Sequence, residues 1–178
     1  MKKMKALSFV CIAAFAVSGF SYEYLYKPDR VIVSEAEYLY DITDKNLVVD
    51  SAESVIVGTV IERLDVQEDE VGVYTPYKIR VEESLKGELP VTSEILISQR
   101  IGYDNNEKAT IKMSKNDEYL NTGESFIFSL RLDERDGIHR IIVPEYGNVK
   151  IKEVKEKKFD SSIVNSYKEV ALKVKSKQ

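Results

Sequence analysis

The chain has 178 residues and a formal net charge of −4, from 26 basic and 30 acidic side chains. Its hydrophobic fraction of 43% is sufficient for the core of one domain, and its eight glycines and four prolines exclude a collagenous or intrinsically disordered chain. The single cysteine excludes an internal disulfide framework, and the single histidine excludes a histidine-rich metal site.

Residues 1–20 have the form of a secretory leader. Lys2, Lys3 and Lys5 precede an apolar run over residues 6–20, and a basic head followed by about 15 apolar residues is typical of a signal peptide. Small side chains permit cleavage after residue 16, 18 or 19. An uncleaved anchor is the alternative, since the tyrosines that follow would lengthen the run toward the roughly 20 residues of a membrane span.

Both alternatives place the rest of the chain outside the cytoplasm, and an anchor would attach the protein to the membrane through residues 6–26. Cys11 lies within the leader, so the exported part contains no cysteine. The residues before Cys11 do not fit a lipidation motif, which argues against a lipoprotein. Exported proteins without cysteine are typical of cells with little disulfide-forming machinery. We therefore expect an extracytoplasmic protein of Gram-positive type, secreted or anchored to the outer face of the cytoplasmic membrane.

Charge is distributed unevenly along the chain. The leader holds three lysines, and residues 149–178 hold nine lysines and four acids, which leaves a net charge of −12 on residues 21–148. An acidic body repels phosphate backbones, and the sequence contains no basic groove with interleaved aromatic residues, so nucleic acid is not expected as a partner. The basic tail has the pattern of a solvated face, and contact with an anionic envelope and contact with the acidic body are the alternatives.

Two short elements are predicted before the main strands. Residues 31–33 are all β-branched and predict an extended segment. A short helix is predicted within residues 41–50. Its expected N-cap is Asp41 or Thr43, and its expected buried contacts are Leu47 and Val48.

The first main strands are indicated by composition and by alternation. Residues 55–61 are dense in β-branched side chains and predict a buried strand, in which Gly58 marks a bulge or a tight bend. Residues 64–70 are predicted to be a polar connection. Residues 71–83 then alternate between apolar and charged positions, which predicts a half-buried strand. Its expected buried positions are Val73, Tyr77, Ile79 and Val81.

The remaining strands are predicted at residues 94–98, 125–130 and 138–143, with an extension over 149–154. Turn residues over 85–90 precede the first of these strands, and a polar excursion over 102–115 follows it. Asp136 and Gly137 are a strong hairpin signal between the last two.

Residues 160–175 predict an amphipathic helix. Asp160 is its expected N-cap, and Phe159 and Val164 stand at the positions of a hydrophobic staple. Its apolar stripe consists of Ile163, Tyr167, Val170, Ala171 and Val174. A helix this short is marginal alone, so we expect the stripe to pack on the strands and to close an open end of a small barrel. The side chains expected in water are Lys168, Lys173 and Lys175, and binding of the stripe to a membrane surface is the alternative.

Together these elements predict a mainly β fold: a five- to six-stranded OB-like Greek-key barrel with a short helix before it and a C-terminal amphipathic helix. Irregular strand spacing and one long connection favour this topology over an even meander. The expected organisation is a signal peptide or anchor over 1–20, an extended linker over 21–44, the barrel over 45–155 and the helix over 156–178.

Three runs within the barrel segment follow a distinctive order. Residues 51–60 contain the strand Val-Ile-Val-Gly-Thr-Val, which is similar to the VxVxGxV strand of one domain family, residues 77–87 match YxxxVxxxLKG, and residues 123–128 begin with Gly-Glu before an aromatic strand. This order resembles that of the netrin-like domain family, whose best-known members are the tissue inhibitors of metalloproteinases, and it is similar to that of exported bacterial proteins of unknown role. The resemblance covers residues 45–150 and implies a five-stranded OB-like barrel.

The resemblance does not carry an inhibitory site to this chain. The animal inhibitors chelate the zinc of their target through an amino-terminal cysteine that disulfides hold in place. The exported part of this chain contains no cysteine, so no position here matches that residue.

No part of the sequence carries an enzyme signature. His139 is the only imidazole and stands beside Arg140 in a predicted strand, but no Gly-x-Ser-x-Gly nucleophile motif accompanies it. The glycines form no phosphate-binding pattern. We therefore predict no catalytic, cofactor-binding or metal-binding residue, no cofactor and no enzymatic activity.

Acidic runs and tyrosines are the remaining candidates for binding. Glu68-Asp69-Glu70 and Asp104-Asn105-Asn106-Glu107 supply oxygen ligands of the kind that calcium prefers, but the second run lacks EF-hand spacing and both are explained as solvated loops. Residues 133–137 are better explained as a hairpin connection. Four tyrosines on or beside the strands would line a sugar or peptide groove, or pack the rim of the barrel: Tyr74, Tyr77, Tyr103 and Tyr119.

The sequence thus predicts an exported or membrane-anchored, non-enzymatic β-barrel of the bacterial cell envelope that binds an envelope or extracellular protein or a glycan. Two alternatives stay open. One is an extracellular protease inhibitor or regulator, by analogy of fold, and the other is a hydrolase that uses a carboxylate pair.

Overall fold

A computed structural model describes residues 30–34, 37–154 and 158–176. The chain divides into two units, residues 1–30 and 31–178, and the second contains the helices and strands described below. The predicted leader and the predicted membrane attachment over residues 6–26 lie outside the described residues. Within the described ranges, no helix combines the length and the apolar character needed to cross a bilayer.

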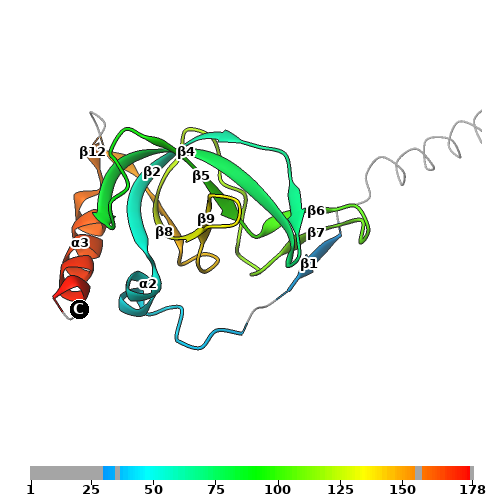
Figure 1. Ribbon diagram of the computed structural model, residues 1–178, viewed down its shortest axis with the longest axis horizontal. Coiled ribbons are helices and arrows are strands. Elements are labelled where there is room, and N and C mark those ends of the chain that lie inside the picture. Colours follow the sequence, from blue (N-terminus) through cyan, green and yellow to red (C-terminus); the bar gives the residue numbers. More distant parts are fainter. Residues whose placement is uncertain (1–29, 35–36, 155–157, 177–178) are drawn as a thin grey trace, which may run out of the picture. The chain divides into compact units, whose positions relative to one another are not determined.

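The fold is mainly β, as predicted (Figure 1), and its largest sheet has seven strands. These strands are β2 (Ser54–Arg63), β3 (Gln67–Asp69), β4 (Gly72–Lys86), β5 (Glu94–Gln99), β8 (Ser125–Asp133), β9 (Ile138–Ile141) and β10 (Asn148–Ile151). Their order is β10-β8-β2-β4-β5-β9, with β3 paired to β4, and β8 pairs with β9 as well. The β5–β9 pair is parallel, and the other pairs of this sheet are antiparallel.

The strands predicted from β-branched runs and from alternation are confirmed. Val73, Tyr77, Ile79 and Val81 are buried along β4, as the alternation predicted. Gly58 stands at a register shift between β2 and β4, which confirms the predicted irregularity. Asp136 and Gly137 form the hairpin between β8 and β9, where the Gly137 N–H donates to the Asp133 carbonyl over 2.8 Å.

Two regions predicted to be irregular are strands instead. The predicted connection over residues 64–70 contains β3, because the Asp69 carboxylate accepts the Val71 N–H and closes a tight turn into β4. The predicted polar excursion over 102–115 contains β6 (Ile101–Asp104) and β7 (Ala109–Lys112), joined by a turn in which Asp104 Oδ1 accepts two backbone N–H groups. The predictions missed both because polar side chains there serve the turns, while Ile101 and Ala109 are buried.

Two smaller sheets complete the strands. β1 (Val31–Val33) confirms the predicted extended segment and pairs in parallel with β7, which gives a three-stranded sheet with the order β1-β7-β6. β11 (Glu153–Val154) and β12 (Lys158–Phe159) form a two-stranded sheet before the last helix.

The first described helix, α2 (Lys45–Ser51), lies where it was predicted but is capped and oriented differently. Asp44 is its N-cap, with the side chain accepting the Asn46 N–H over 2.8 Å. The side chain of Asp41, one of the two predicted caps, instead accepts the Thr43 N–H within the preceding turn. Val48 is buried, as predicted, together with Val49, whereas Leu47, the other predicted buried contact, is 39% exposed.

The C-terminal helix, α3 (Ser161–Lys175), confirms the predicted cap and most of the predicted stripe. The Asp160 side chain accepts the Ser162 N–H, and the buried residues are Val164, Tyr167, Val170, Ala171 and Val174, with Ile163 half-buried. Lys173 and Lys175 are exposed as predicted, whereas Lys168 forms an ion pair with Glu83 over 2.7 Å.

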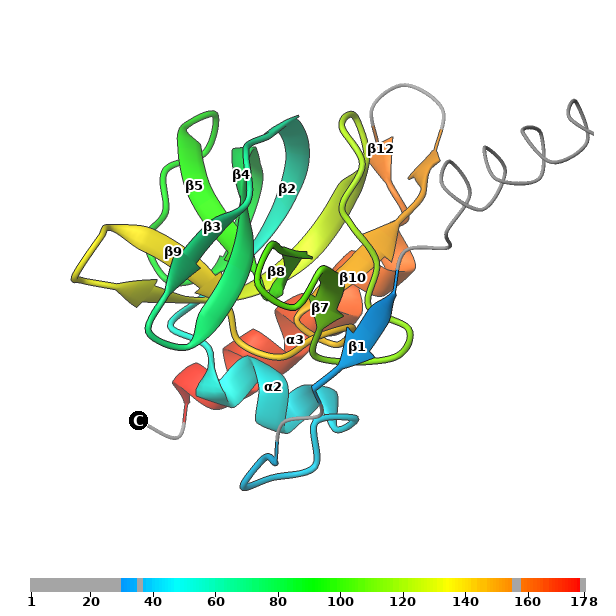
Figure 2. The same cartoon turned by 90° about the vertical axis from the view of Figure 1, so that its right-hand side faces the viewer.

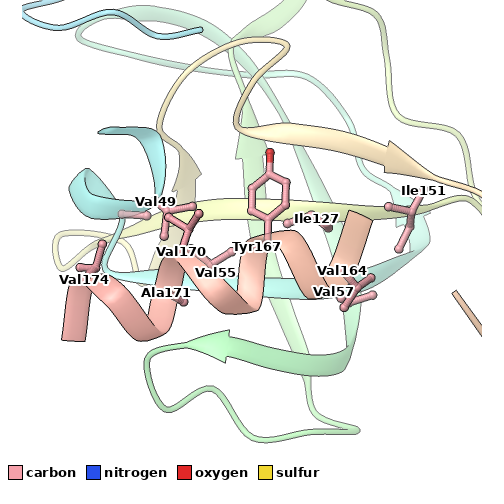
Figure 3. Packing of buried hydrophobic residues seen from close by; sticks show 11 residues of the cluster. Val49, Val55, Val57, Ile127, Ile151, Val164, Tyr167, Val170, Ala171 and Val174 are labelled. Atoms are coloured by element: carbon pink, nitrogen blue, oxygen red, sulfur yellow. The ribbon is translucent and has the colours of Figure 1, made fainter. Parts of the chain in front are cut away.

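The helix packs on one face of the sheet. The prediction that it closes the open end of a barrel is therefore wrong. Alternate residues of β2 point to opposite faces: Val55 and Val57 join α2 and α3 in one apolar cluster, and Ile56 and Val60 join a second cluster. Figure 3 shows Tyr167 and Val170 of α3 against the first of these clusters. α2 and α3 lie side by side on this face (Figure 2).

Lys86, the lysine of the LKG run, fastens β4 to the end of α2. Its ammonium group donates to the backbone carbonyls of Val49, Asp50 and Ala52 over 2.9, 2.9 and 2.6 Å. Carbonyls at a helix C-terminus have no partner within the helix and carry partial negative charge, so a cation satisfies them well. Burial lowers the pKa of Lys86, as expected for an ammonium held among these groups.

We predict that Lys86→Met lowers the free energy of unfolding by about 1.5–3 kcal/mol, because hydrogen bonds to a charged group are lost and partly buried carbonyls are left without a donor. Lys78→Met is the control, because Lys78 makes an exposed ion pair with Glu62 over 3.4 Å, which is worth about 0–1 kcal/mol. Urea unfolding of both variants measures the difference. Equal losses would refute the proposed role of Lys86 as a cap.

Candidate functional site

The segment between β7 and β8 covers the second apolar cluster of the sheet, the one that contains Ile56 and Val60, which we call the inner cluster. Leu120 belongs to this cluster, and its backbone N–H donates to the Tyr77 hydroxyl over 3.3 Å. Backbone hydrogen bonds from Gly123 to Val60 and from Val60 to Glu124 attach the segment to β2. This segment therefore covers the cluster at the place that α3 was predicted to close. The same segment brings the carboxyl group of Asp117 into the protein.

Asp117 is 2% exposed and only partly satisfied by hydrogen bonds. The Gln99 amide donates to its Oδ1 over 2.7 Å and to the Glu118 carbonyl over 2.8 Å, while Gln99 Oε1 accepts the Tyr77 hydroxyl over 3.2 Å. The other oxygen, Oδ2, has no hydrogen-bond partner within the described part of the chain. The Glu145 backbone N–H approaches the carboxyl and favours its charge, but without hydrogen-bond geometry toward Oδ2.

Burial raises the pKa of Asp117 to about 6. The hydrogen bond from Gln99 and the positive charge of Lys112 oppose this shift, and the negative charge of Glu145 adds to it. Burial also raises the pKa of Tyr77, and burial together with Tyr40 and Asp117 raises the pKa of Tyr38.

Glu145 belongs to the loop between β9 and β10 and has a left-handed backbone, with φ of 62°. This conformation is uncommon for a residue other than glycine and persists only where the surroundings hold it. Here the Glu145 carboxylate accepts the Ser114 hydroxyl and, over 3.5 Å, the Asn116 amide, so the loop is held against the segment that carries Asp117.

A cleft of about 270 Å³ opens between this segment and the loop, and we call it the Asp117 cleft. Its carboxylates are Asp117, Glu118, Glu124 and Glu145. Its other polar side chains are Asn116, Asn121, Asn148 and Lys150. Two further hollows adjoin it: one of about 380 Å³ shares Asn116 and Glu145 with it, and one of about 80 Å³ shares Asp117, both with Tyr38 in their walls.

The Asp117 cleft presents more acceptors than donors. The Asn121 amide donates to Glu124 over 3.3 Å, and Lys150 forms an ion pair with the same carboxylate. The Asn148 side-chain oxygen is buried without a hydrogen-bond partner among the described residues, as is Asp117 Oδ2. Chemically, the cleft is suited to a ligand that donates hydrogen bonds.

We predict that Asp117→Asn makes stability less sensitive to pH. The native pKa of about 6 lies above the roughly 3.9 of an unfolded aspartate, so the native state keeps a proton that the unfolded state has lost. This contribution is fully present below about pH 4 and is lost as the pH rises through 6, which costs the wild type about 2–3 kcal/mol by pH 8. Urea unfolding at pH 4 and pH 8 should show a smaller fall for the variant, and parallel pH profiles would refute the assignment.

His139, the only imidazole, lies half-buried in β9 and is not brought to the Asp117 cleft. Its Nδ1 is buried and has no hydrogen-bond partner in the described ranges, and burial lowers the pKa of the imidazole. No triad geometry can therefore be assigned through Nδ1.

The acidic runs that were considered for calcium are occupied by structural contacts. Arg100 donates to both carboxylate oxygens of Asp69, over 2.7 and 2.6 Å, and these hydrogen bonds lower the pKa of Asp69 to about 2. Asp104 closes the β6–β7 turn, as described above. Within residues 30–34, 37–154 and 158–176, no group of three or more histidine, cysteine, aspartate or glutamate side chains is placed to hold a metal.

A network of arginines and carboxylates joins β3, β5 and the β8–β9 hairpin. Arg140 forms ion pairs with Asp136 and, over 3.5 Å, with Asp133, and it donates to Ser98 over 2.9 Å. The guanidinium groups of Arg100 and Arg140 lie 5.3 and 4.7 Å from the centre of the Tyr74 ring. Because the charges compensate one another, the network is explained as a structural link between strands.

The four tyrosines named from the sequence do not gather in one groove. Tyr77 is fully buried, and Tyr74 is buried beneath the arginines with its hydroxyl bonded to Gln67. Tyr103 is exposed on β6, outside the Asp117 cleft. Only Tyr119 lines that cleft, with its ring 4.5 Å from the Arg63 guanidinium group.

Sequence reasoning missed the residues that form the Asp117 cleft. Asp117 lies in a polar run, and Glu145 and Asn148 in another, with no motif that distinguishes them from solvated loops. The Pro-Glu-Tyr-Gly run over residues 144–147 indicates a turn but no site. No protein-family model matches the chain, and no curated protein matches it at a significant level.

Proposed function

We propose that this chain is an extracytoplasmic, non-enzymatic binding module of the bacterial cell envelope, built on an OB-like barrel. The observation that carries the proposal is the Asp117 cleft, where a buried carboxyl oxygen and a buried amide oxygen have no partner in the described part of the chain. Buried polar groups are nearly always hydrogen-bonded in native proteins. Unpaired buried acceptors on two side chains that line one cleft therefore favour a site that a ligand completes.

The strand pairing supports the OB-like part of the proposal. β2 pairs with β4, β4 with β5, β5 with β9, β9 with β8, and β8 with β2 again, so the pairings return to their starting strand. Closure of this kind removes exposed strand edges. The register shifts along β2 supply the local bending that closure needs.

The resemblance to the netrin-like family is supported by the structural roles of the motif residues in this chain. Lys86 of the LKG run caps α2, the short helix that precedes the first barrel strand. Gly87 has φ of +82°, and a Cβ atom there would lie 2.7 Å from Ser54 Oγ, so this position requires glycine. These residues join the helix, β2 and β4, so the motif positions have a structural role here.

We prefer binding to carboxylate-based hydrolysis because of the contacts that the carboxyl groups of the cleft make. A hydrolase that uses two carboxyl groups needs one of them kept protonated beside an ionised partner that is free to face the substrate. Among the described residues, Asp117 is the carboxyl with a raised pKa, while its neighbour Glu145 is engaged by Ser114 and Asn116. The acceptor-rich wall is accounted for by ligand binding alone.

The proposal is tested with the full chain, tagged at its C-terminus and expressed in a Gram-positive host. Intact mass after fractionation should show either a species that begins near residues 17–20 in the medium or the full-length chain in the membrane. Recovery from the cytoplasm alone would contradict the proposed location.

Binding is measured by adding the exported chain to isolated wall and membrane fractions. Saturable binding, competed by untagged protein, is expected and should fall in Asn148→Ala. Asp65→Asn is the control, because Asp65 is exposed and lies outside the cleft. Absence of saturable binding to both fractions would overturn the proposed function.

A further inference from the structure

We propose that the Asp117 cleft binds a primary ammonium group, such as that of a small aliphatic amine or of a lysine side chain. The proposal rests on the binding function inferred above and names the chemical class of the ligand. It follows from which hydrogen-bonding groups of the cleft are already paired and which are left over.

Three donor side chains of the cleft wall are engaged with acceptors of the same wall. The Asn116 amide donates to Glu145, the Asn121 amide donates to Glu124, and Lys150 is paired with Glu124. The acceptors left over are Asp117 Oδ2 and Asn148 Oδ1, both buried and without a partner in the described ranges. The missing partner is therefore a donor of hydrogen bonds, and an anionic ligand would add acceptors where acceptors are already in excess.

The charge of the cleft favours a cationic donor over a neutral one. Four carboxylates line it against one ammonium group, that of Lys150. A bound cation would compensate the buried Asp117 charge, which a sugar hydroxyl would leave uncompensated. A primary ammonium ion supplies three N–H donors together with this charge.

The side chains available as metal ligands and the volume of the cleft indicate which kind of cation would bind. The described residues place no group of three or more histidine, cysteine, aspartate or glutamate side chains for a metal, which disfavours a divalent ion. A volume of about 270 Å³ accommodates the ammonium group and a short aliphatic chain. Leu120 and Phe126 are in the same wall and provide apolar contact for such a chain.

The test compares the binding of 1-aminobutane, tetramethylammonium and 1-butanol to the full chain by isothermal titration calorimetry, at pH 8 and low ionic strength. Tetramethylammonium carries the charge but no N–H donor, and butanol carries a donor but no charge. We expect the amine to bind about tenfold more tightly than either, since tetramethylammonium cannot donate a hydrogen bond and butanol has no charge to pair with the carboxylate. Equal affinity for amine and tetramethylammonium would overturn the proposal.

Variants locate the site. Asp117→Asn should weaken 1-aminobutane binding about tenfold, and Asn148→Ala about threefold, whereas Asp65→Asn should bind as the wild type does. Asn148 is half-buried in the cleft wall and belongs to neither apolar cluster, so its variant tests the site even where Asp117→Asn disturbs folding. Unchanged affinity in the folded cleft variants would overturn the proposal.

Binding should also strengthen as the pH rises from 5 to 8, because Asp117 loses its proton while the amine stays charged. The titratable groups around it are Glu145 from the β9–β10 loop, Lys112 from β7, Tyr77 from β4 and Tyr38, with Arg100 in the wall of the adjoining small pocket. Asp117→Asn should remove most of this pH dependence, and a pH-independent wild type would contradict the proposed contact.

The source of the ammonium group is distinguished by two further probes, 1,5-diaminopentane for a free amine and Nα-acetyl-lysine methylamide for a lysine side chain. Tighter binding of the first indicates a free amine, and tighter binding of the second indicates a peptide. If the chain binds envelope fractions but none of the amines, this inference fails and the proposed function stands. If it binds amines at the cleft but no envelope fraction, the inference stands and the envelope function fails.

Discussion

Replacing Tyr167 with alanine should lower the free energy of unfolding by about 3–5 kcal/mol, the usual cost of deleting a buried aromatic side chain. Tyr167 is 7% exposed and stands at the centre of the α3 stripe, in one cluster with Val49, Val55 and Ile127 (Figure 3). The Lys45 ammonium group lies 5.3 Å from the centre of its ring and adds a cation–π contact. Urea unfolding of the full chain, followed by circular dichroism, measures the loss.

Leu172→Ala provides the matched control on the same helix. Leu172 is 67% exposed, so its removal should change the free energy of unfolding by no more than about 0.5 kcal/mol. Vesicles of anionic lipid address the membrane alternative for the stripe. If Tyr167→Ala leaves stability unchanged and abolishes vesicle binding, the docking of α3 on the sheet is wrong and the stripe belongs to a membrane surface.

The elements that could be predicted are those whose signal is local. Consecutive β-branched side chains over residues 55–61 predict β2. A cap and an apolar stripe at helical spacing over residues 160–175 predict α3. Alternation of apolar and charged positions predicts the buried face of β4, which consists of Val73, Tyr77, Ile79 and Val81. In each case the residues that decide the structure lie within a few positions of one another.

The elements that were missed depend on partners far along the chain. β7 is a strand because it pairs with β6 and with β1, and the β1 partner of Ile111 is Ile32. α3 covers a face of the sheet and not its end, because Val55 and Val57 of β2 present that face, whereas Leu120 reaches the inner cluster. No local sequence pattern indicates which of these surfaces an element will pack against.

The Asp117 cleft could not be predicted for the same reason. Asp117 is one of 30 acids in the sequence, and nothing beside it marks it as buried. Its burial results from Gln99 of β5, Tyr77 of β4 and the loop that carries Glu145. The raised pKa of its carboxyl group is thus a property of the fold.

Gly58 shows the conflict between local preference and packing at a single position, and its substitution is the second large expected effect. Gly58→Val should lower the free energy of unfolding by about 3 kcal/mol or more, although valine is the better strand former. A Cβ atom at Gly58 would lie 2.5 Å from Ile79 Cγ2 and 3.2 Å from Phe128 Cδ2, both in the fully buried inner cluster. Overpacking of a filled core forces side chains off their rotamers or moves the backbone.

The expected order of stability is therefore wild type, then Gly58→Ala, which loses about 1–3 kcal/mol, then Gly58→Val. Strand propensity alone predicts the reverse order. A double-mutant cycle identifies the cause: Ile79→Ala removes the nearest methyl group, so Gly58→Ala should cost about 0.5–3 kcal/mol less in that background than in the wild type. An additive cycle, or a Gly58→Val variant as stable as the wild type, would show that the close approach of β2 to Ile79 does not limit this position.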